Sequence, residues 1–280
     1  MLKNGKSPKK IEEEIKMLIR ELKKHDDMKY SMEREEELKE IRDKLVFVGK
    51  PAVTQLIEVL NKHKNQSSQY AADALGEIGD RRAITPLVDA LEESELGESV
   101  KEALKKFGSV CILEVIKKLE YRIAHPISKG VSIDRVTAYA LNTIGEIRCD
   151  KSINFLNKLL DDYMSEMPDE AFDPTKRDWK YRNVDFFHLL DCMVRQQDKR
   201  AIPYIRKARD FFPENYTDYK ICQIAIGRIK KGEVEGYLPM EAMEIAYPSG
   251  AIMDALSGGS FGWKDTFDED YGKYFEDEEK

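Results

Sequence analysis

Residues 71–91 read AADALGEIGDRRAITPLVDAL, and nearly the same phrase returns at residues 140–160 as ALNTIGEIRCDKSINFLNKLL. A shift of 69 residues places Gly76 of the first copy on Gly145 of the second. A looser copy, QQDKRAIPYIRKA, follows at residues 196–208. A phrase that returns along a chain indicates a repeat architecture, in which each copy folds as a similar unit and stacks on its neighbours.

The spacing of apolar residues inside the phrase predicts helices. In residues 83–91, apolar side chains stand at i, i+1, i+4, i+5 and i+8, which fall on one face of a helix. The preceding helix is expected to stop at Gly79, a residue suited to the C′ position, and Asp80 is expected to cap the helix that follows. Few stretches alternate with the period of two that is typical of strands. Each repeat is therefore predicted to be two helices joined by a tight turn, in an all-α fold.

The first helix of each repeat starts with a related phrase. In five places a small residue occupies the same position: Ala52, Ala83, Cys111, Ser152 and Ala201. The second helices are expected near residues 67–78, 97–107, 133–147, 181–195 and 216–230. A more charged pair, at about 8–24 and 32–47, completes a predicted α-solenoid of about six antiparallel helix pairs. The predicted regions are an N-terminal capping helix pair (1–47), the repeat array (48–232), a C-terminal capping segment (233–260) and an irregular acidic, aromatic tail (261–280).

The phrase at residues 71–91 resembles the HEAT-repeat family, in particular its short form, the PBS-lyase HEAT-like repeat. The resemblance extends over residues 48–232 and is strongest in 48–91 and 138–160. It implies an α-solenoid whose first helices lie on a convex side and whose second helices line a concave groove. Packing points the same way, because a single helix pair cannot bury its apolar face without neighbours.

Charge separates the tail from the rest of the chain. The net charge of the 280 residues is −7, and residues 264–280 contribute eight acids against three lysines. The remainder is close to neutral, so phosphate-driven binding of nucleic acid is not expected. The four cysteines are single and far apart, without a CxxC pair, so neither a zinc site nor a redox pair is expected.

Signals for targeting or membrane insertion are not visible in the sequence. Nowhere do about 18 apolar residues run together. The N-terminal MLKNGKSPKK is followed by a charged helical pattern instead of an apolar signal segment. We therefore expect a soluble, cytoplasmic protein.

Three departures from the repeat pattern are candidate partner-binding sites. The long linker at residues 163–183 carries a tryptophan among basic residues: Lys176, Arg177, Trp179, Lys180 and Arg182. The last repeat, residues 198–231, holds nine Lys/Arg against four acids, and its first helix contains Arg206 and Arg209. The tail spaces aromatic residues among its acids: Trp263, Phe267, Tyr271, Tyr274 and Phe275. Each also has a plainer interpretation: a loop pinned by its aromatic residues, a solvated helix face and a solvating tail, respectively.

A catalytic arrangement is not evident. Deoxyhypusine hydroxylases, whose repeats are similar to these, bind di-iron through His-Glu dipeptides, but the four histidines here are followed by Asp26, Lys64, Pro126 and Leu189. Phosphate-binding loops and the GxSxG nucleophile motif do not occur. His188 and Cys192 stand one helical turn apart, yet no carboxylate that would orient them is identified. We therefore expect no enzyme activity, no cofactor and no metal.

The predicted function is that of a non-catalytic scaffold, adaptor or assembly factor. It would bind a protein partner, alone or within a larger complex, through the concave face and edge loops. The alternative is an accessory enzyme or maturation factor that attaches a cofactor to a protein substrate, and a distant third is nucleic-acid binding. The acidic aromatic tail is expected to bind either a partner or the chain's own basic last repeat.

Overall fold

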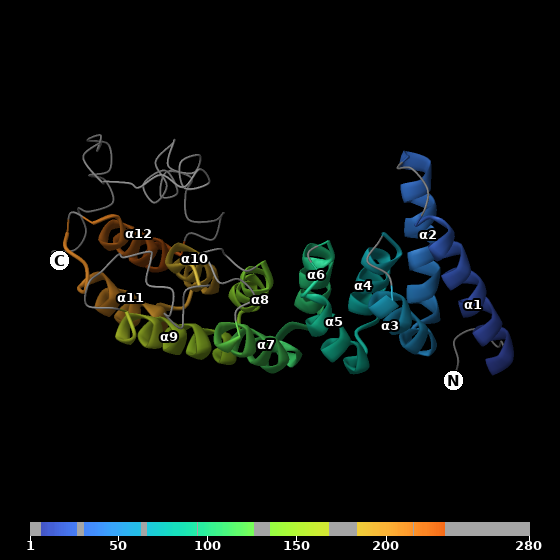
Figure 1. The fold of residues 1–280 in the computed structure, drawn as a ribbon, viewed down its shortest axis with the longest axis horizontal. Coiled ribbons are helices and arrows are strands. Elements are labelled where there is room, and N and C mark those ends of the chain that lie inside the picture. The colour runs from blue at the N-terminus through green and yellow to red at the C-terminus, as the bar shows by residue number, and fades with distance from the viewer. Residues whose placement is uncertain are drawn as a thin grey trace. The chain divides into compact units, whose positions relative to one another are not determined.

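The computed structural model describes residues 7–26, 31–62, 66–93, 95–125, 135–167, 184–214 and 216–232. Every regular element in these residues is helical (Figure 1). The α-helices are α1 (Pro8–Lys24), α2 (Met32–Val48), α3 (Val53–Lys62), α4 (Gln66–Ile78), α5 (Ile84–Ala90), α6 (Gly97–Phe107), α7 (Ile112–Ala124), α8 (Arg135–Glu146), α9 (Asp150–Ser165), α10 (Phe186–Gln196), α11 (Ile202–Arg209) and α12 (Thr217–Lys231). None of these helices is long and apolar enough to cross a membrane. The predicted all-α fold is confirmed.

The chain divides into two compact units, Met1–Arg148 and Cys149–Lys280. In the first unit, the helices pair in chain order, from α1 with α2 to α7 with α8. Odd-numbered helices pack on odd-numbered neighbours and even-numbered helices on even-numbered ones, so the pairs stack. In the second unit, α9 packs on α10 and α11 on α12, while α9 also contacts α11 and α10 contacts α12. Stacked helix pairs are the packing of a helical repeat, so the predicted repeat architecture is confirmed.

The small residue that opens each first helix is buried inside the stack. Its exposed fraction is 0% in every repeat where the sequence placed it: Ala52, Ala83, Cys111, Ser152 and Ala201. In four repeats this residue ends or follows a short 3-10 turn, where an α-helix was expected: η1 (Lys50–Ala52), η2 (Arg81–Ala83), η3 (Gly108–Val110) and η4 (Lys199–Ala201). A 3-10 turn is tighter than an α-helical turn. The turns contact neighbouring helices, η1 with α1 and α2 and η2 with α3, and the buried small residue fits this close packing.

Asp80 caps η2, as the sequence predicted. Its carboxylate accepts a hydrogen bond from the backbone N–H of Arg82 at 3.0 Å and pairs with the guanidinium of the same residue at 3.0 Å. That guanidinium also donates to the Lys50 carbonyl of the preceding repeat, at 3.1 Å. The hydrogen bonds from Arg82 lower the pKa of Asp80 to about 2. Asp198 and Arg200 repeat this Asp-x-Arg arrangement in the second unit.

Two boundaries around the long linker at residues 163–183 differ from the sequence prediction. The linker was expected from residue 163, but α9 continues to Ser165 because Met164 still packs into the core, with 8% of its surface exposed. The next helix was expected near residue 181, whereas α10 begins at Phe186. The Asp185 carboxylate fixes this start, since it accepts a backbone N–H of the first turn at 2.7 Å.

Candidate partner-binding surface

Two of the twelve residues predicted to bind a partner, Arg206 and Arg209, lie in the described part of the chain. Both belong to α11, the first helix of its pair. Neither therefore lies on a second helix, where the groove was expected. The other ten predicted residues lie outside the described residues: Lys176, Arg177, Trp179, Lys180, Arg182, Trp263, Phe267, Tyr271, Tyr274 and Phe275.

One face of α11 is exposed and basic. Ile205 and Ala208 turn into the second unit, with exposed fractions of 0% and 1%. Arg206 and Lys207, which stand between them in the sequence, project into solvent. Pro203, in the first turn of the helix, is exposed on the same side. A partner can therefore reach this face over the length of the helix.

Arg209 has a different role from Arg206. Only 14% of its side chain is exposed, and its guanidinium pairs with the Asp210 carboxylate at 2.9 Å. It also stands 5.6 Å from the ring centroid of Tyr219 in α12, which is within cation–π distance. Arg209 therefore connects α11 to α12, and of the two predicted arginines only Arg206 is exposed.

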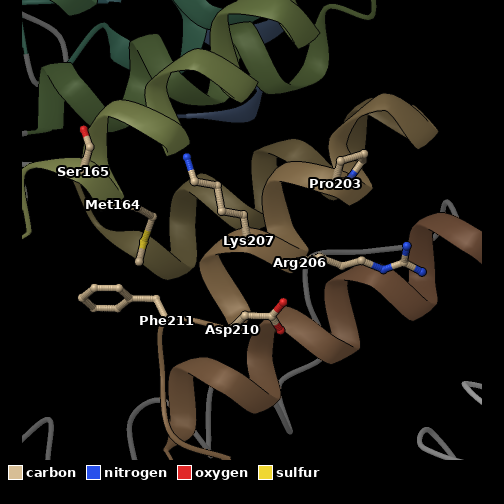
Figure 2. Close-up of a pocket in the computed structure, with 7 residues that line it drawn as sticks. All are labelled: Met164, Ser165, Pro203, Arg206, Lys207, Asp210 and Phe211. Atoms are coloured by element: carbon tan, nitrogen blue, oxygen red, sulfur yellow. The ribbon is translucent and has the colours of Figure 1, made fainter.

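The exposed face of α11 borders a hollow of about 610 Å³, here called the α11 hollow. The end of α9, α11 and the turn that follows α11 supply its lining: Met164, Ser165, Pro203, Arg206, Lys207, Asp210 and Phe211 (Figure 2). In Figure 2, Lys207 points toward Ser165, whereas Arg206 points to the opposite side. A hollow of this size can accept several side chains of a bound peptide.

Arg206 is the basic group of the α11 hollow that a ligand can use. Lys207 forms an ion pair with Asp161 of α9, and Asp210 pairs with Arg209. Arg206 forms no ion pair with any residue that the structure describes. Its planar guanidinium offers five N–H donors in a geometry that suits a carboxylate. The hollow therefore favours an acidic ligand.

Phe211 is the aromatic group that the α11 hollow presents to solvent. Its exposed fraction is 45%, whereas that of the adjacent Phe212 is 5%. The two rings meet edge to face, with their centroids 5.4 Å apart. Phe212 in turn packs on Phe186 of α10 at 5.5 Å, and Phe186 packs on Tyr163 of α9 at 5.6 Å. Phe212, Phe186 and Tyr163 thus form a row of buried rings against which Phe211 packs.

Phe211 and Met164 were not among the residues that sequence reasoning selected. The signal was present for Phe211, because the chain reads DFFPEN directly after a basic helix. Neighbouring residues at the end of a helix point about 100° apart, so one of two consecutive phenylalanines can face solvent while the other is buried, although both can be buried, as Leu189 and Leu190 are. Met164 gave no such signal, since a methionine at the end of an amphipathic helix normally lies in the core.

The second helices of the first unit present charges that already pair with one another. Lys106 of α6 pairs with Glu77 of α4 at 2.9 Å, and Lys105 pairs with Glu146 of α8 at 2.6 Å. Lys101, with 8% of its side chain exposed, lies within 3.6 Å of three carboxylates: Glu98, Glu102 and Glu146. Burial lowers the pKa of Lys101, but these carboxylates outweigh burial, so the pKa lies above its ordinary value. A partner would have to break these ion pairs to use this face.

Several titratable groups of α10 and α12 have shifted pKa values. Burial, together with the nearby Asp185 charge, raises the pKa of Asp218 to about 6. Burial also lowers the pKa of His188 and raises that of the Cys222 thiol. Cys192, one turn from His188, has no exposed surface. In the described ranges, no three His, Cys, Asp or Glu side chains come together in a way that could hold a metal ion.

Residues 69–93 match the family model of the PBS lyase HEAT-like repeat. The matched segment covers most of α4, the η2 turn and α5, which is the second helix of one pair and the first helix of the next. The resemblance drawn from the sequence is therefore confirmed for this segment. A search of curated proteins gives no match to the chain.

Proposed function

We propose that this chain is a non-catalytic helical-repeat protein that binds a protein partner, and that the α11 hollow is its principal contact. The observation that supports this function is the combination of Phe211 with Arg206 in one hollow. Phe211 is exposed and packs edge to face on the buried Phe212, and Arg206 forms no ion pair with any described residue.

Aromatic and arginine side chains are enriched among the residues that contribute most to binding between proteins. A residue of this kind contributes most where the free protein already holds it in its bound position, since little entropy is then lost on binding. The edge-to-face contact with Phe212 meets this condition for Phe211. Binding would remove the remaining exposed surface of the ring from water.

The second-helix face of the first unit is the less suitable surface. Its lysines and glutamates neutralise one another in the free protein, as the Lys106–Glu77 and Lys105–Glu146 pairs show. An exposed pair such as Lys106–Glu77 contributes about 0–1 kcal/mol. A partner that displaced them would gain little, because each new ion pair would replace an existing one.

An alternative function is favoured by the name of the matched model. Residues 69–93 match a repeat that is named after a lyase, so an accessory enzyme that attaches a cofactor to a protein substrate is the second candidate. Its substrate would also be a protein, and the α11 hollow would then be its docking surface. Turnover by the purified chain with a candidate substrate would favour this alternative over a pure binding role.

The test is affinity purification of the tagged full chain followed by mass spectrometry and quantification of the recovered partner. The variants are Phe211→Ala and Arg206→Glu. The matched control is Phe47→Ala, which removes another exposed phenylalanine, 67% exposed, from α2. All variants are first compared with the wild type by circular dichroism.

We expect a stoichiometric partner with the wild type and with Phe47→Ala, and at least a tenfold loss with Phe211→Ala or Arg206→Glu, as is typical for residues at the centre of an interface. Recovery at the wild-type level with both hollow variants would show that the partner binds elsewhere. If no protein co-purifies in stoichiometric amount, the partner-binding function is wrong.

A further inference from the structure

We propose that, in the free protein, the occupant of the α11 hollow is the chain's own acidic aromatic segment, residues 261–280. The consequence, that this segment competes with the partner, rests on the proposed function of the hollow. The inference follows from the charge of the last repeat, from the chemistry of the hollow and from the position of α12 in the chain.

The charges of the two segments are complementary. Residues 198–231 hold nine Lys/Arg against four acids, whereas residues 264–280 hold eight acids against three lysines. Within the described part of the last repeat, Arg200, Lys207 and Arg209 have acidic partners. Arg206 and Lys199 form no ion pair with a described residue. Charges of opposite sign attract over a Debye length of about 8–10 Å at physiological salt, so the tail is drawn toward this repeat.

The hollow offers one kind of contact for each of the two kinds of residue in the segment, the acids and the aromatic residues. The Arg206 guanidinium can donate two parallel hydrogen bonds to a carboxylate. Phe211 and Met164 lie on one side of the hollow in Figure 2 and offer an edge-to-face partner and a polarizable thioether for a ring. The segment alternates acids with aromatic residues, and four of the aromatic positions would share one face of a helix: Phe267, Tyr271, Tyr274 and Phe275. A ligand with only acids would contact Arg206 alone, and a ligand with only aromatic residues would contact Phe211 and Met164 alone.

The chain places this segment within reach. The second unit contains both the hollow and α12, after which Gly232 leaves the helix with φ of +70°. Residues 233–260 then separate α12 from the segment, and a chain of that length spans about 30 Å even as a random coil. A tethered ligand of this kind has an effective concentration of about 1 mM. A segment that binds as a free peptide with a Kd of about 100 µM would therefore be about 90% bound.

This occupancy has a consequence for the partner. A hollow that is about 90% filled by the tail binds an external ligand about tenfold more weakly than an empty one. A partner that succeeds must offer a better acidic and aromatic segment, or it must bind the displaced tail as well. Acidic peptides that bind the hollow only weakly would therefore not displace the tail.

The test uses the purified full chain with the photo-cross-linking residue p-benzoylphenylalanine in place of Phe211. After irradiation at about 1 µM protein, we expect the cross-links located by mass spectrometry to fall within residues 261–280. The matched control carries the same group in place of Phe47 on α2, and we expect no enrichment of tail cross-links there. Adding Arg206→Glu to the Phe211-substituted chain should lower the yield at least tenfold, and about 1 M salt should also lower it. A mixture of ¹⁵N-labelled and unlabelled chains separates contacts within one chain from contacts between two.

The inference is overturned by three results. The first is a tail cross-link yield no higher than that of the Phe47 control, and the second is cross-linking from position 211 to another part of the chain. The third is a product that joins labelled to unlabelled chains, which would make a second copy the occupant. Partner purification separates this inference from the proposed function. Loss of the partner in Phe211→Ala without tail cross-links would overturn the tail contact alone, whereas tail cross-links with unchanged partner recovery would overturn the assigned partner surface alone.

Discussion

Gly76 of α4 lies so close to Ala103 of α6 that a Cβ atom on Gly76 would stand 2.8 Å from the Ala103 Cα and 3.0 Å from its Cβ. The next residue, Glu77, pairs with Lys106 on the same neighbouring helix at 2.9 Å. The repeated phrase Gly-Glu-Ile thus places a close backbone contact and an ion pair side by side. A glycine in a helix interior costs about 0.5–1 kcal/mol relative to alanine, and here the closer helix contact offsets that cost.

Gly76→Ala should destabilise the first unit. Its Cβ would press on the backbone of Ala103, which cannot move aside as a flexible side chain can, and overpacking of this kind costs about 1–3 kcal/mol. The measurement is denaturant unfolding, with amide hydrogen exchange of α4 and α6 to locate the effect. Gly227→Ala in α12 is the control, because a Cβ there meets nothing within 4 Å. We expect the control to be neutral or stabilising by up to about 1 kcal/mol; equal destabilisation by both variants would contradict the close-contact argument.

Asp80→Ala should remove the cap of η2 and its link to the preceding repeat. We expect a loss of about 1 kcal/mol at pH 7, typical of an N-cap aspartate. Because the folded pKa is lowered from 3.8 to about 2, the contribution of Asp80 is complete above about pH 4. It is lost as the pH falls toward 2, so the wild type and the variant should converge there.

Urea unfolding at several pH values between 2 and 7 measures this convergence. The equivalent variant in the second unit, Asp198→Ala, should behave in the same way, because the Arg200 hydrogen bond lowers the pKa of Asp198 as well. A difference between wild type and Asp80→Ala that stays constant down to pH 3 would show that the charge of the carboxylate is not what stabilises the turn.

The repeat could be predicted from the sequence because equivalent positions of the phrase have equivalent packing environments in each helix pair. Ala52, Ala83 and Ala201 stand at one position of the phrase, and each is fully buried at the same point of its helix pair. The Asp80 cap was predictable for a similar reason, since a carboxylate directly before an apolar periodic run has few other local roles. Local rules of this kind depend only on residues a few positions apart.

The candidate site could be predicted only in part, because it depends on contacts that are not local. Arg206 and Arg209 are both arginines of α11, and the sequence alone does not distinguish them. In the structure, the ring of Tyr219 and the Asp210 carboxylate hold Arg209 in place. Met164 reaches the α11 hollow only because α9 and α11 pack side by side. Neither relationship follows from helical periodicity within one segment.

Asp218→Asn should stabilise the second unit in a manner that depends on pH. Burial and the Asp185 charge raise the folded pKa of Asp218 from 3.8 to about 6, so the folded state binds the proton more tightly than the unfolded state. Stability therefore falls as the pH rises from about 4 through about 6. Asparagine does not ionise, so the variant should gain about 1–3 kcal/mol over the wild type at pH 7.5 and almost nothing at pH 4.

Thermal unfolding of both proteins at pH 4 and pH 7.5 measures the gain. Asp210→Asn is a suitable control, since that carboxylate is 63% exposed and pairs with Arg209. A gain for Asp218→Asn that is the same at both pH values would mean that ionisation of Asp218 is not its cause.

Substitution of the two adjacent phenylalanines should have different effects. Phe212→Ala should reduce the stability of the fold, whereas Phe211→Ala should mainly reduce binding of the partner. Phe212 is 5% exposed and touches both Phe186 and Phe211, so Phe212→Ala should cost about 3–5 kcal/mol, as is usual for a buried aromatic residue. Phe211→Ala removes a ring that is 45% exposed and should cost about 1 kcal/mol or less. Chemical denaturation of the two variants, read beside recovery of the partner, tests this separation. If Phe211→Ala were as destabilising as Phe212→Ala, Phe211 would belong to the core of the second unit and could not be the group that a partner contacts.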